Sequence, residues 1–198
     1  MFKIVFCTHN KNKLREFGQI LAQTGLEAAL LTPGDVGHDE EVEETGSTFE
    51  ENALLKARSI ARYGYLAVAD DSGLEVDALD NAPGIYSARY SGLGDAENNA
   101  KLLRELENVP EEERGARFVC AMAAVFPDGR EIVFRESCPG VITRALHGEN
   151  GFGYDPLFFC SIYGKTFAEM NGEEKNAVSH RGKAVRRMAA VLAQELRA

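Results

Sequence analysis

The stretch at residues 65–74, YLAVADDSGL, joins a short apolar run to two acidic residues, a serine and a glycine. Residues 65–69 are long enough for a buried strand, and the Asp and Gly that follow favour a turn at its end. Asp70 and Asp71 would be costly there unless a cation or hydrogen-bond donors bound them, because their charges repel each other and lose water. We therefore expect a functional site at this strand end. A plain strand-ending turn is the alternative.

Strands and helices alternate on both sides of this stretch. Two helix starts are marked by polar residues: Thr48 and Glu51 form a capping-box pattern, and Asp95 can cap a third helix. The turn at residues 127–129 predicts a hairpin, and its first strand has apolar residues on both faces, which predicts a central position in the sheet. The pattern predicts an α/β fold with a mixed central sheet and flanking helices, built by residues 1–198 as a single domain. The predicted strands are 3–7, 28–31, 65–69, 118–126 and 131–138, and the predicted helices carry residues 14–21, 49–60, 102–106 and 185–196 on their apolar faces.

The composition excludes several classes of protein. With 198 residues, of which 44% are hydrophobic, the chain can bury one sizeable core. Its formal net charge of -9 argues against a partner nucleic acid, because a duplex-binding surface needs a positive field. No run approaches the roughly 20 apolar residues that cross a bilayer, so we expect a cytoplasmic protein with no membrane partner. The four cysteines match neither zinc nor disulfide spacing, and we expect buried thiols.

Two polar segments precede the acidic pair. Residues 8–13, THNKNK, lie between a predicted strand and a predicted helix, where free N–H groups, the helix dipole and a lysine can bind phosphate. A solvated helix cap is the alternative. Residues 39–46, DEEVEETG, have the composition of a solvated acidic loop, but Glu44 lies beside the turn at Gly46 and is a candidate metal ligand. Mg²⁺ takes one or two carboxylates and completes its shell with water and substrate phosphate. Ser72 could donate to that phosphate.

Two further polar segments lie near the C-terminus. In residues 151–156, GFGYDP, the glycines allow a close backbone approach, the aromatic rings offer stacking faces and Asp155 is an acceptor. Residues 174–181, EKNAVSHR, form a cationic cluster at the start of the last predicted helix. A plain turn and a polar helix cap are the respective alternatives.

Together these segments give the chain a family resemblance that spans nearly its whole length. Any one motif is common, but six of them in order are hard to obtain by chance. The chain resembles the inosine triphosphate pyrophosphatase family, in particular its bacterial branch of dITP/XTP pyrophosphatases. The motifs are residues 8–13 (TxNxxK), 44–53 (ETGxTFxENA), 69–74 (ADDSGL), 83–90 (PGxYSARY), 151–156 (GFGYDP) and 179–181 (SHR).

This resemblance implies an elongated two-lobed fold with a nucleotide cleft between the lobes, a homodimer and Mg²⁺ as cofactor. It implies hydrolysis of non-standard purine nucleoside triphosphates (ITP, dITP, XTP) to a monophosphate and pyrophosphate, which would keep such bases out of DNA and RNA. Asp71 would be the catalytic base, and Glu44 and Asp71 would hold the metal. The implied substrate-binding residues are Thr8, His9, Asn10, Lys11, Asn12, Lys13, Lys56, Ser72, Phe152, Gly153, Tyr154, Asp155, Lys175, His180 and Arg181.

Base selection is expected to use the purine O6 atom. Inosine and xanthosine present an acceptor there, whereas adenine presents an amino donor. We expect Phe152 to stack on the ring and His180 and Arg181 to donate to O6. Two other functions remain open at this stage. A related pyrophosphatase of the septum-inhibition type would act on pyrimidine or modified nucleotides, and a non-catalytic nucleotide-binding module would bind without turnover.

Overall fold

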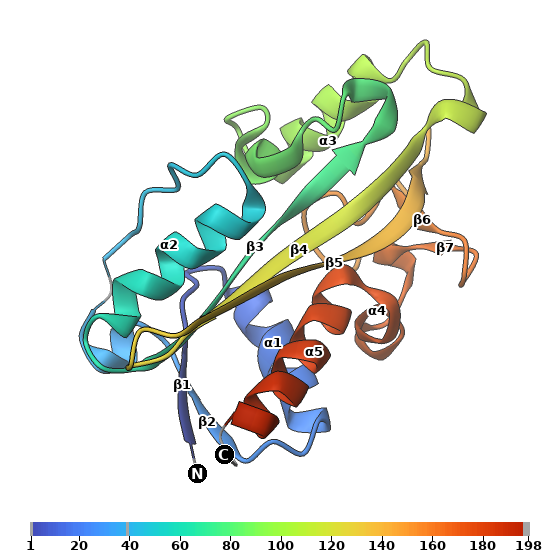
Figure 1. Ribbon diagram of the computed structural model, residues 1–198. Coiled ribbons are helices and arrows are strands. Elements are labelled where there is room, and N and C mark those ends of the chain that lie inside the picture. The colour runs from blue at the N-terminus through green and yellow to red at the C-terminus, as the bar shows by residue number, and fades with distance from the viewer. Residues whose placement is uncertain (1, 39, 196–198) are drawn as a thin grey trace. The chain divides into compact units, whose positions relative to one another are not determined.

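Seven strands form one mixed sheet in the computed structural model, which describes residues 2–38 and 40–195 (Figure 1). The strand order is β2-β1-β3-β4-β5-β6-β7. β1 pairs in parallel with β2 and β3, whereas β6 pairs antiparallel with β5 and β7. The predicted α/β fold with a mixed sheet is confirmed. The strands are β1 (Phe2–Phe6), β2 (Ala28–Leu31), β3 (Leu66–Val76), β4 (Gly115–Val125), β5 (Glu131–Ile142), β6 (Phe158–Cys160) and β7 (Lys165–Thr166); the α-helices are α1 (Lys11–Gln23), α2 (Phe49–Ala61), α3 (Asp95–Glu105), α4 (Gly172–Val178) and α5 (His180–Glu195).

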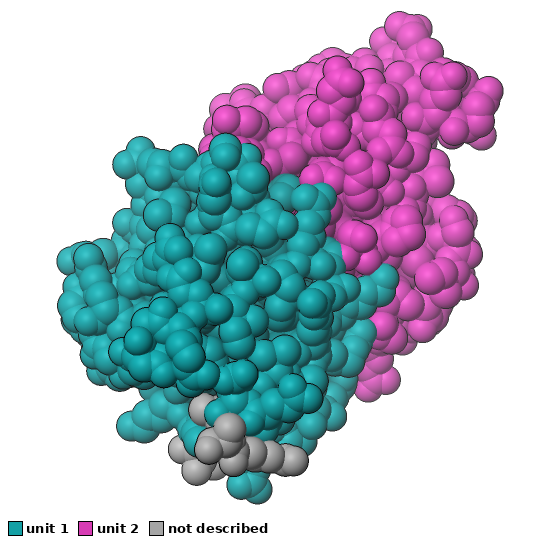
Figure 2. All heavy atoms as spheres, viewed as in Figure 1, with its two compact units in different colours: residues 1–71, 120–136, 181–198 teal, residues 72–119, 137–180 magenta. Residues whose placement is uncertain are grey.

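The chain divides into two compact units, shown in different colours in Figure 2. Unit 1 consists of residues 1–71, 120–136 and 181–198, and unit 2 consists of residues 72–119 and 137–180. Each unit has its own cluster of buried apolar side chains. Three of the four unit boundaries fall within β3, β4 and β5, so each of these strands contributes residues to both units. The fourth lies between His180 and Arg181, at the start of α5.

In unit 1, helices cover both faces of β1 and β3. The buried residues of α1, which include Phe17 and Ile20, pack with Val68 and with α5 residues such as Met188. α2 lies on the other side of the two strands in Figure 1 and buries Phe49 and other apolar residues. Leu196, expected on the apolar face of the last helix, lies outside the described residues, as does Asp39 of the acidic loop.

The strand β3, third in the strand order, is longer than the sequence predicts. Its first residues form the expected apolar strand, but the strand continues through Asp70 and Asp71 to Val76 instead of turning after Ala69. Both carboxylates are buried in the sheet and bonded to cationic side chains, which offset the cost of removing their charges from water. β4, the next strand in the order, is almost wholly buried, as its two apolar faces predict.

Three helix starts differ in detail from their predictions. Thr48 caps α2 as expected and accepts the N–H of Glu51, but the Glu51 carboxylate accepts from Ser47. Gly94 occupies the cap position of α3, which frees the Asp95 side chain for another partner. Residues 174–178 of the segment expected at the start of the last helix lie in a separate short helix, α4, whereas His180 and Arg181 begin α5, close to the predicted start.

In unit 2, α3 and the segment η3 (Gly84–Arg89) pack with the strand residues of that unit. Leu102 and Leu106 contribute to its buried cluster together with Leu74, Phe118 and Phe158. All four cysteines are free and buried, as predicted. Burial raises the pKa of the Cys7 thiol to about 12. Among the described residues, no helix combines the length and apolar character that crossing a membrane requires.

Candidate functional site

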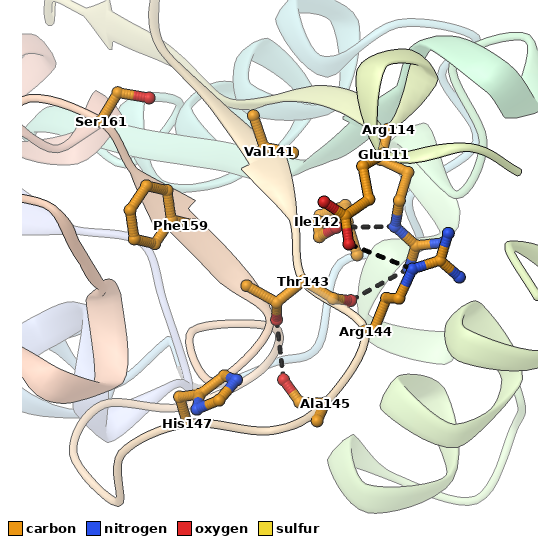
Figure 3. Close-up of a pocket in the computed structure, with 10 residues that line it drawn as sticks. All are labelled: Glu111, Arg114, Val141, Ile142, Thr143, Arg144, Ala145, His147, Phe159 and Ser161. Carbon is orange, nitrogen blue, oxygen red and sulfur yellow. Dashed lines mark hydrogen bonds and ion pairs between the residues drawn. The ribbon is translucent and has the colours of Figure 1, made fainter.

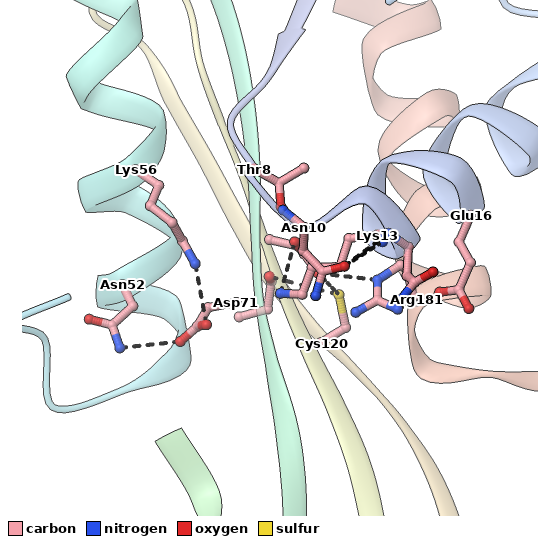
Figure 4. Close-up of polar contacts among 12 residues, drawn as sticks. Thr8, Asn10, Lys13, Glu16, Asn52, Lys56, Asp71, Cys120 and Arg181 are labelled. Atoms are coloured by element: carbon pink, nitrogen blue, oxygen red, sulfur yellow. Dashed lines mark hydrogen bonds and ion pairs between the residues drawn. The ribbon is translucent and has the colours of Figure 1, made fainter. Parts of the chain in front are cut away.

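Asp70 and Asp71 point to opposite faces of β3. Successive side chains of a strand alternate between the faces of the sheet, so neighbouring carboxylates cannot share one side. Asp70 contacts side chains of α1 and α5. Asp71 contacts side chains of α2 (Figure 4). The paired carboxylates therefore form two different sites, and both lie in unit 1.

The Asp70 carboxylate is a buried counter-ion for two cations. Its Oδ1 atom lies 3.2 Å from Nζ of Lys13, and its Oδ2 atom lies 3.2 Å from Nε of Arg181. The thiol of Cys120 lies 3.9 Å from the same Oδ2 atom. Burial alone would raise the pKa of Asp70, but the charges of Lys13 and Arg181 outweigh burial and hold that pKa well below its usual range. Asp70 is therefore ionised in the folded protein.

Arg181 donates to two buried carboxylates. Its side chain is 2% exposed, and besides Asp70 it donates through Nη1 to the carboxylate of Glu16. We expected a donor to O6 of a purine, but these two carboxylates engage its Nε and Nη1 atoms. The two buried carboxylates neutralise Arg181. From its place on α5, Arg181 in turn fixes the position of Asp70.

Glu16 did not emerge from the sequence as a functional residue, although a signal for it was present. It stands four positions before Ile20 on the buried face of α1, where an apolar residue is expected. An acidic residue at such a position needs a buried cationic partner. That partner is Arg181, 165 positions away in the chain.

On the opposite face of β3, one lysine joins the two predicted metal ligands. Nζ of Lys56 donates to Oε1 of Glu44 at 2.7 Å and to Oδ1 of Asp71 at 3.3 Å. Asn52, a fully buried residue of α2, donates to Oδ2 of Asp71 at 3.2 Å. Burial raises the pKa of Asp71, and the charges of Lys56 and Lys13 oppose that rise. The acidic loop and β3 thus meet at Lys56.

Asn52 also places the acidic loop. Its Oδ1 atom accepts the N–H of Gly46 at 2.8 Å, next to the residues that carry Glu44. A Cβ atom at Gly46 would lie 2.6 Å from that Oδ1 atom, so only glycine allows this close approach. Sequence reasoning did not select Asn52, but a polar residue inside the apolar face of α2 was the available signal.

The donors around Asp71 fit a magnesium ion. Glu44 and Asp71 both supply hard carboxylate oxygens, and both reach the same ammonium group, so a cation placed there would face both. No group of three or more His, Cys, Asp and Glu side chains suited to a metal occurs in residues 2–38 and 40–195. Two carboxylates are enough for Mg²⁺ when phosphate and water complete its shell.

The start of α1 differs from the predicted phosphate cradle. The Oδ1 atom of Asn10 accepts the N–H groups of Asn12 and Lys13, so these amides already have a partner. Thr8 accepts the N–H of Asn10, and His9 and Lys11 are exposed. The Lys13 ammonium, held by Asp70, is the fixed positive charge at this helix start.

In unit 2, the loop at residues 151–155 is built around a buried ion pair. Oδ2 of Asp155 accepts from Nζ of Lys175 at 2.6 Å and from the N–H of Phe152 at 2.9 Å. Nζ of Lys175 also lies 4.7 Å from the centre of the Phe152 ring. A Cβ atom at Gly151 would lie 2.0 Å from Oδ2 of Asp155, which explains the glycine. Asp155 thus positions Lys175 and the backbone of Phe152.

Three other predicted residues of unit 2, His180, Ser72 and Tyr154, have different neighbours from this ion pair. The His180 ring is buried and stacks on Phe118 with centroids 4.8 Å apart. Ser72 is half-buried in β3. The hydroxyl of Tyr154 donates to the carbonyl oxygen of Ser87 at 2.9 Å, which ties the loop to the PGxYSARY motif. The hydroxyl of Ser87 accepts the N–H of Leu74 at 2.8 Å, so this motif is a scaffold between β3 and the loop.

A cavity of about 490 Å³ in unit 2 contains none of the predicted site residues (Figure 3). Arg114 lies in its wall, but that guanidinium donates to the carbonyl oxygens of Leu106, Ile142 and Thr143 and so supports the backbone. The cavity is lined by Glu111, Arg114, Val141, Ile142, Thr143, Arg144, Ala145, His147, Phe159 and Ser161.

Comparison with known proteins gives full-length matches. The model of the Ham1 family matches residues 4–191. The dITP/XTP pyrophosphatase of Desulforamulus reducens is 50% identical over 193 residues, which cover 96% of this chain and 95% of that protein. The dITP/XTP pyrophosphatase of Geobacter sulfurreducens is 55% identical over 188 residues, covering 93% and 94%. The solved structure of a HAM1 protein from Coxiella burnetii superimposes with a TM-score of 0.88 at 39% identity, covering 98% of this chain and 100% of that one.

Proposed function

The chain belongs to the Ham1 family, and on that premise we propose that it hydrolyses non-standard purine nucleoside triphosphates such as dITP, ITP and XTP to a nucleoside monophosphate and pyrophosphate. The relatives' activity supports the reaction class. The observation that carries the proposal is the meeting of Glu44, Lys56 and Asp71 on one face of β3. Two carboxylates and an ammonium at one point suit a metal-bound polyphosphate better than any neutral ligand.

The chemistry assigned to these residues is phosphoryl transfer to water. Mg²⁺, held by Glu44 and Asp71, would neutralise phosphate oxygens and favour the pyrophosphate leaving group. Lys13 and Lys56 add positive charge for the triphosphate. Water attacks the α-phosphorus, the bond from that phosphorus to the bridging oxygen breaks, and a carboxylate oxygen of Asp71 accepts the proton of the water. Burial raises the pKa of Asp71, and a bound Mg²⁺ would oppose that rise while also making the attacking water more acidic.

We assign recognition of the purine base to residues of unit 2. Phe152 offers a half-buried ring for stacking, and His180 is the proposed donor to the purine O6 atom. An adenine amino group would leave such a donor unpaired, which costs about 1–3 kcal/mol for a buried group. Because Nε and Nη1 of Arg181 already donate to Asp70 and Glu16, we assign the selection to Phe152, Lys175 and His180.

The experiment that tests the function is pyrophosphate release from a panel of triphosphates, each with and without Mg²⁺. We expect dITP, ITP and XTP to be hydrolysed with a kcat/KM about 100-fold or more above that for ATP and pyrimidine triphosphates, and only with the metal. Preference for a pyrimidine nucleotide would favour the septum-inhibition type of enzyme. Binding in Mg²⁺ without any release of pyrophosphate would favour a non-catalytic module.

Lys13→Ala is expected to weaken binding of the triphosphate without altering the choice of base. A point charge on phosphate carries no information about the purine, so KM should rise about tenfold for dITP and for ATP alike. The measurement is kcat and KM for both nucleotides. Arg15→Ala is the matched control, because Arg15 is an exposed cation of the same helix. A loss confined to one of the two purines would contradict this assignment.

The same proposal extends to cellular role and assembly. We propose that the enzyme removes non-standard purines from the nucleotide pool in the cytoplasm, which keeps them out of DNA and RNA, and that it acts as a homodimer. These points follow from the family resemblance of the sequence motifs.

A further inference from the structure

Gly153, in the loop at residues 151–155, is held on both sides by side chains of α3. Its N–H donates to Oδ2 of Asp95 at 2.8 Å, and its carbonyl oxygen accepts from Nδ2 of Asn99 at 2.8 Å. All three residues belong to unit 2. The two helix residues are one turn apart on α3, so a single face of the helix reaches both peptide groups of one glycine.

The orientation of the Asn99 amide is determined by its donors. Nδ2 of Asn99 also donates to the carbonyl oxygen of Asp95 at 2.8 Å, so both of its hydrogens are used. Its Oδ1 atom is buried and has no hydrogen-bond partner among the residues that the structure describes. Rotating the amide by half a turn would place Oδ1 against two carbonyl oxygens, which repel it. Asn99 therefore keeps an unsatisfied acceptor, at a cost in free energy, while both N–H groups of its amide donate to carbonyl oxygens.

These contacts fix the backbone on both sides of Phe152. The N–H of Phe152 donates to Asp155, and the next N–H, that of Gly153, donates to Asp95. The direction of the Phe152 ring depends on the two backbone angles between these peptide groups. Gly153 itself has φ +61°, a conformation that glycine adopts readily, and its carbonyl oxygen accepts from Asn99.

We propose that Asp95 and Asn99 are positioning residues for base recognition: they clamp the Gly153 backbone and thereby set the ring of Phe152 for stacking on the purine. This proposal rests on the proposed function, because it takes Phe152 as the base-stacking residue. Neither Asp95 nor Asn99 touches the phosphates or the metal in this scheme. Losing the clamp therefore affects binding of the base and leaves the chemical step at Asp71 intact.

The test compares Asp95→Ala and Asn99→Ala with the wild-type enzyme. Each variant is expected to raise KM for dITP, because the ring stacks less well, and to lower the ratio of kcat/KM between dITP and dATP by about tenfold, because a displaced purine no longer presents O6 to His180. The kcat for dITP should change by less than about threefold. Asp95→Asn keeps an acceptor for the Gly153 N–H and should restore most of the selectivity. Glu97→Gln is the matched control, because it removes an exposed carboxylate from the same turn of α3. Hydrogen exchange at the amides of residues 152 and 153 should accelerate in the two alanine variants only.

A purely structural role would lower the melting temperature without changing the ratio between the two purines, and that result would overturn the proposal. If an alanine variant fails to fold, Asn99→Ser and Asp95→Ser carry the same test with a smaller change in polarity. Binding of dIMP and dAMP, measured by calorimetry, separates this proposal from the proposed function. A wild-type protein that discriminates the monophosphates but hydrolyses no triphosphate refutes only the activity, whereas clamp variants with unchanged discrimination refute the clamp.

Discussion

Asp71→Asn is expected to lower kcat for dITP by about three orders of magnitude or more, with the fold retained. The change removes the proton acceptor and one charged ligand of the proposed Mg²⁺ while keeping the volume of the side chain. It should cost little stability, because burial raises the pKa of Asp71 and therefore disfavours its charged form in the fold. The measurement is pyrophosphate release at saturating dITP and Mg²⁺, together with the melting temperature.

Asp80→Asn is the control for this change. Asp80 is exposed and has φ 50°, a conformation that asparagine tolerates, so the control removes one aspartate charge without disturbing either site. Its turnover should match the wild-type value. A folded Asp71→Asn protein with near-normal turnover would refute the role of Asp71 and, with it, the proposed reaction centre.

Asp70→Asn is expected to reduce the free energy of unfolding by about 3–5 kcal/mol, because Lys13 and Arg181 lose their shared buried counter-ion. Asp71→Asn should reduce the free energy of unfolding far less, since Asp71 faces different partners from those of Asp70. Urea denaturation followed by circular dichroism measures both. Activity of Asp70→Asn should also fall, through misplacement of Lys13, but stability is the primary effect.

The stability contributed by Asp70 should depend on pH in a defined direction. The pKa of Asp70 is depressed in the folded state, so its contribution is fully present above the ordinary aspartate value near 3.9. It is lost as the pH falls through the lower pKa of the folded state. Wild-type protein should therefore lose more stability in acid than Asp70→Asn does. An unfolding free energy for Asp70→Asn within about 1 kcal/mol of the wild-type value would show that Glu16 alone supports Arg181.

Local patterns in the sequence were enough for most of the fold. The apolar spacing of α1 and the alternation of strands and helices depend on contacts between near neighbours, and the hairpin depends on a turn of three residues. The same is true of the Thr48 cap and of the glycine-rich loop, whose residue types are informative at fixed short spacing. Burial of three of the four cysteines, Cys7, Cys120 and Cys160, followed from the apolar runs around them. The motifs also identified the family that the comparisons confirm.

Which carboxylate pairs with which cation was decided only by the tertiary structure. The sequence shows two adjacent aspartates, but only a continuous β3 places Asp70 with Lys13 and Arg181 and places Asp71 with Lys56. Glu16 and Arg181 are 165 positions apart, and Asn99 and Gly153 are 54 positions apart. Several cations and carboxylates could form such pairs, and short-range periodicity does not distinguish among them. The choice is made when the chain packs, because a buried charge is stable only beside the partner that the fold brings within a few ångströms.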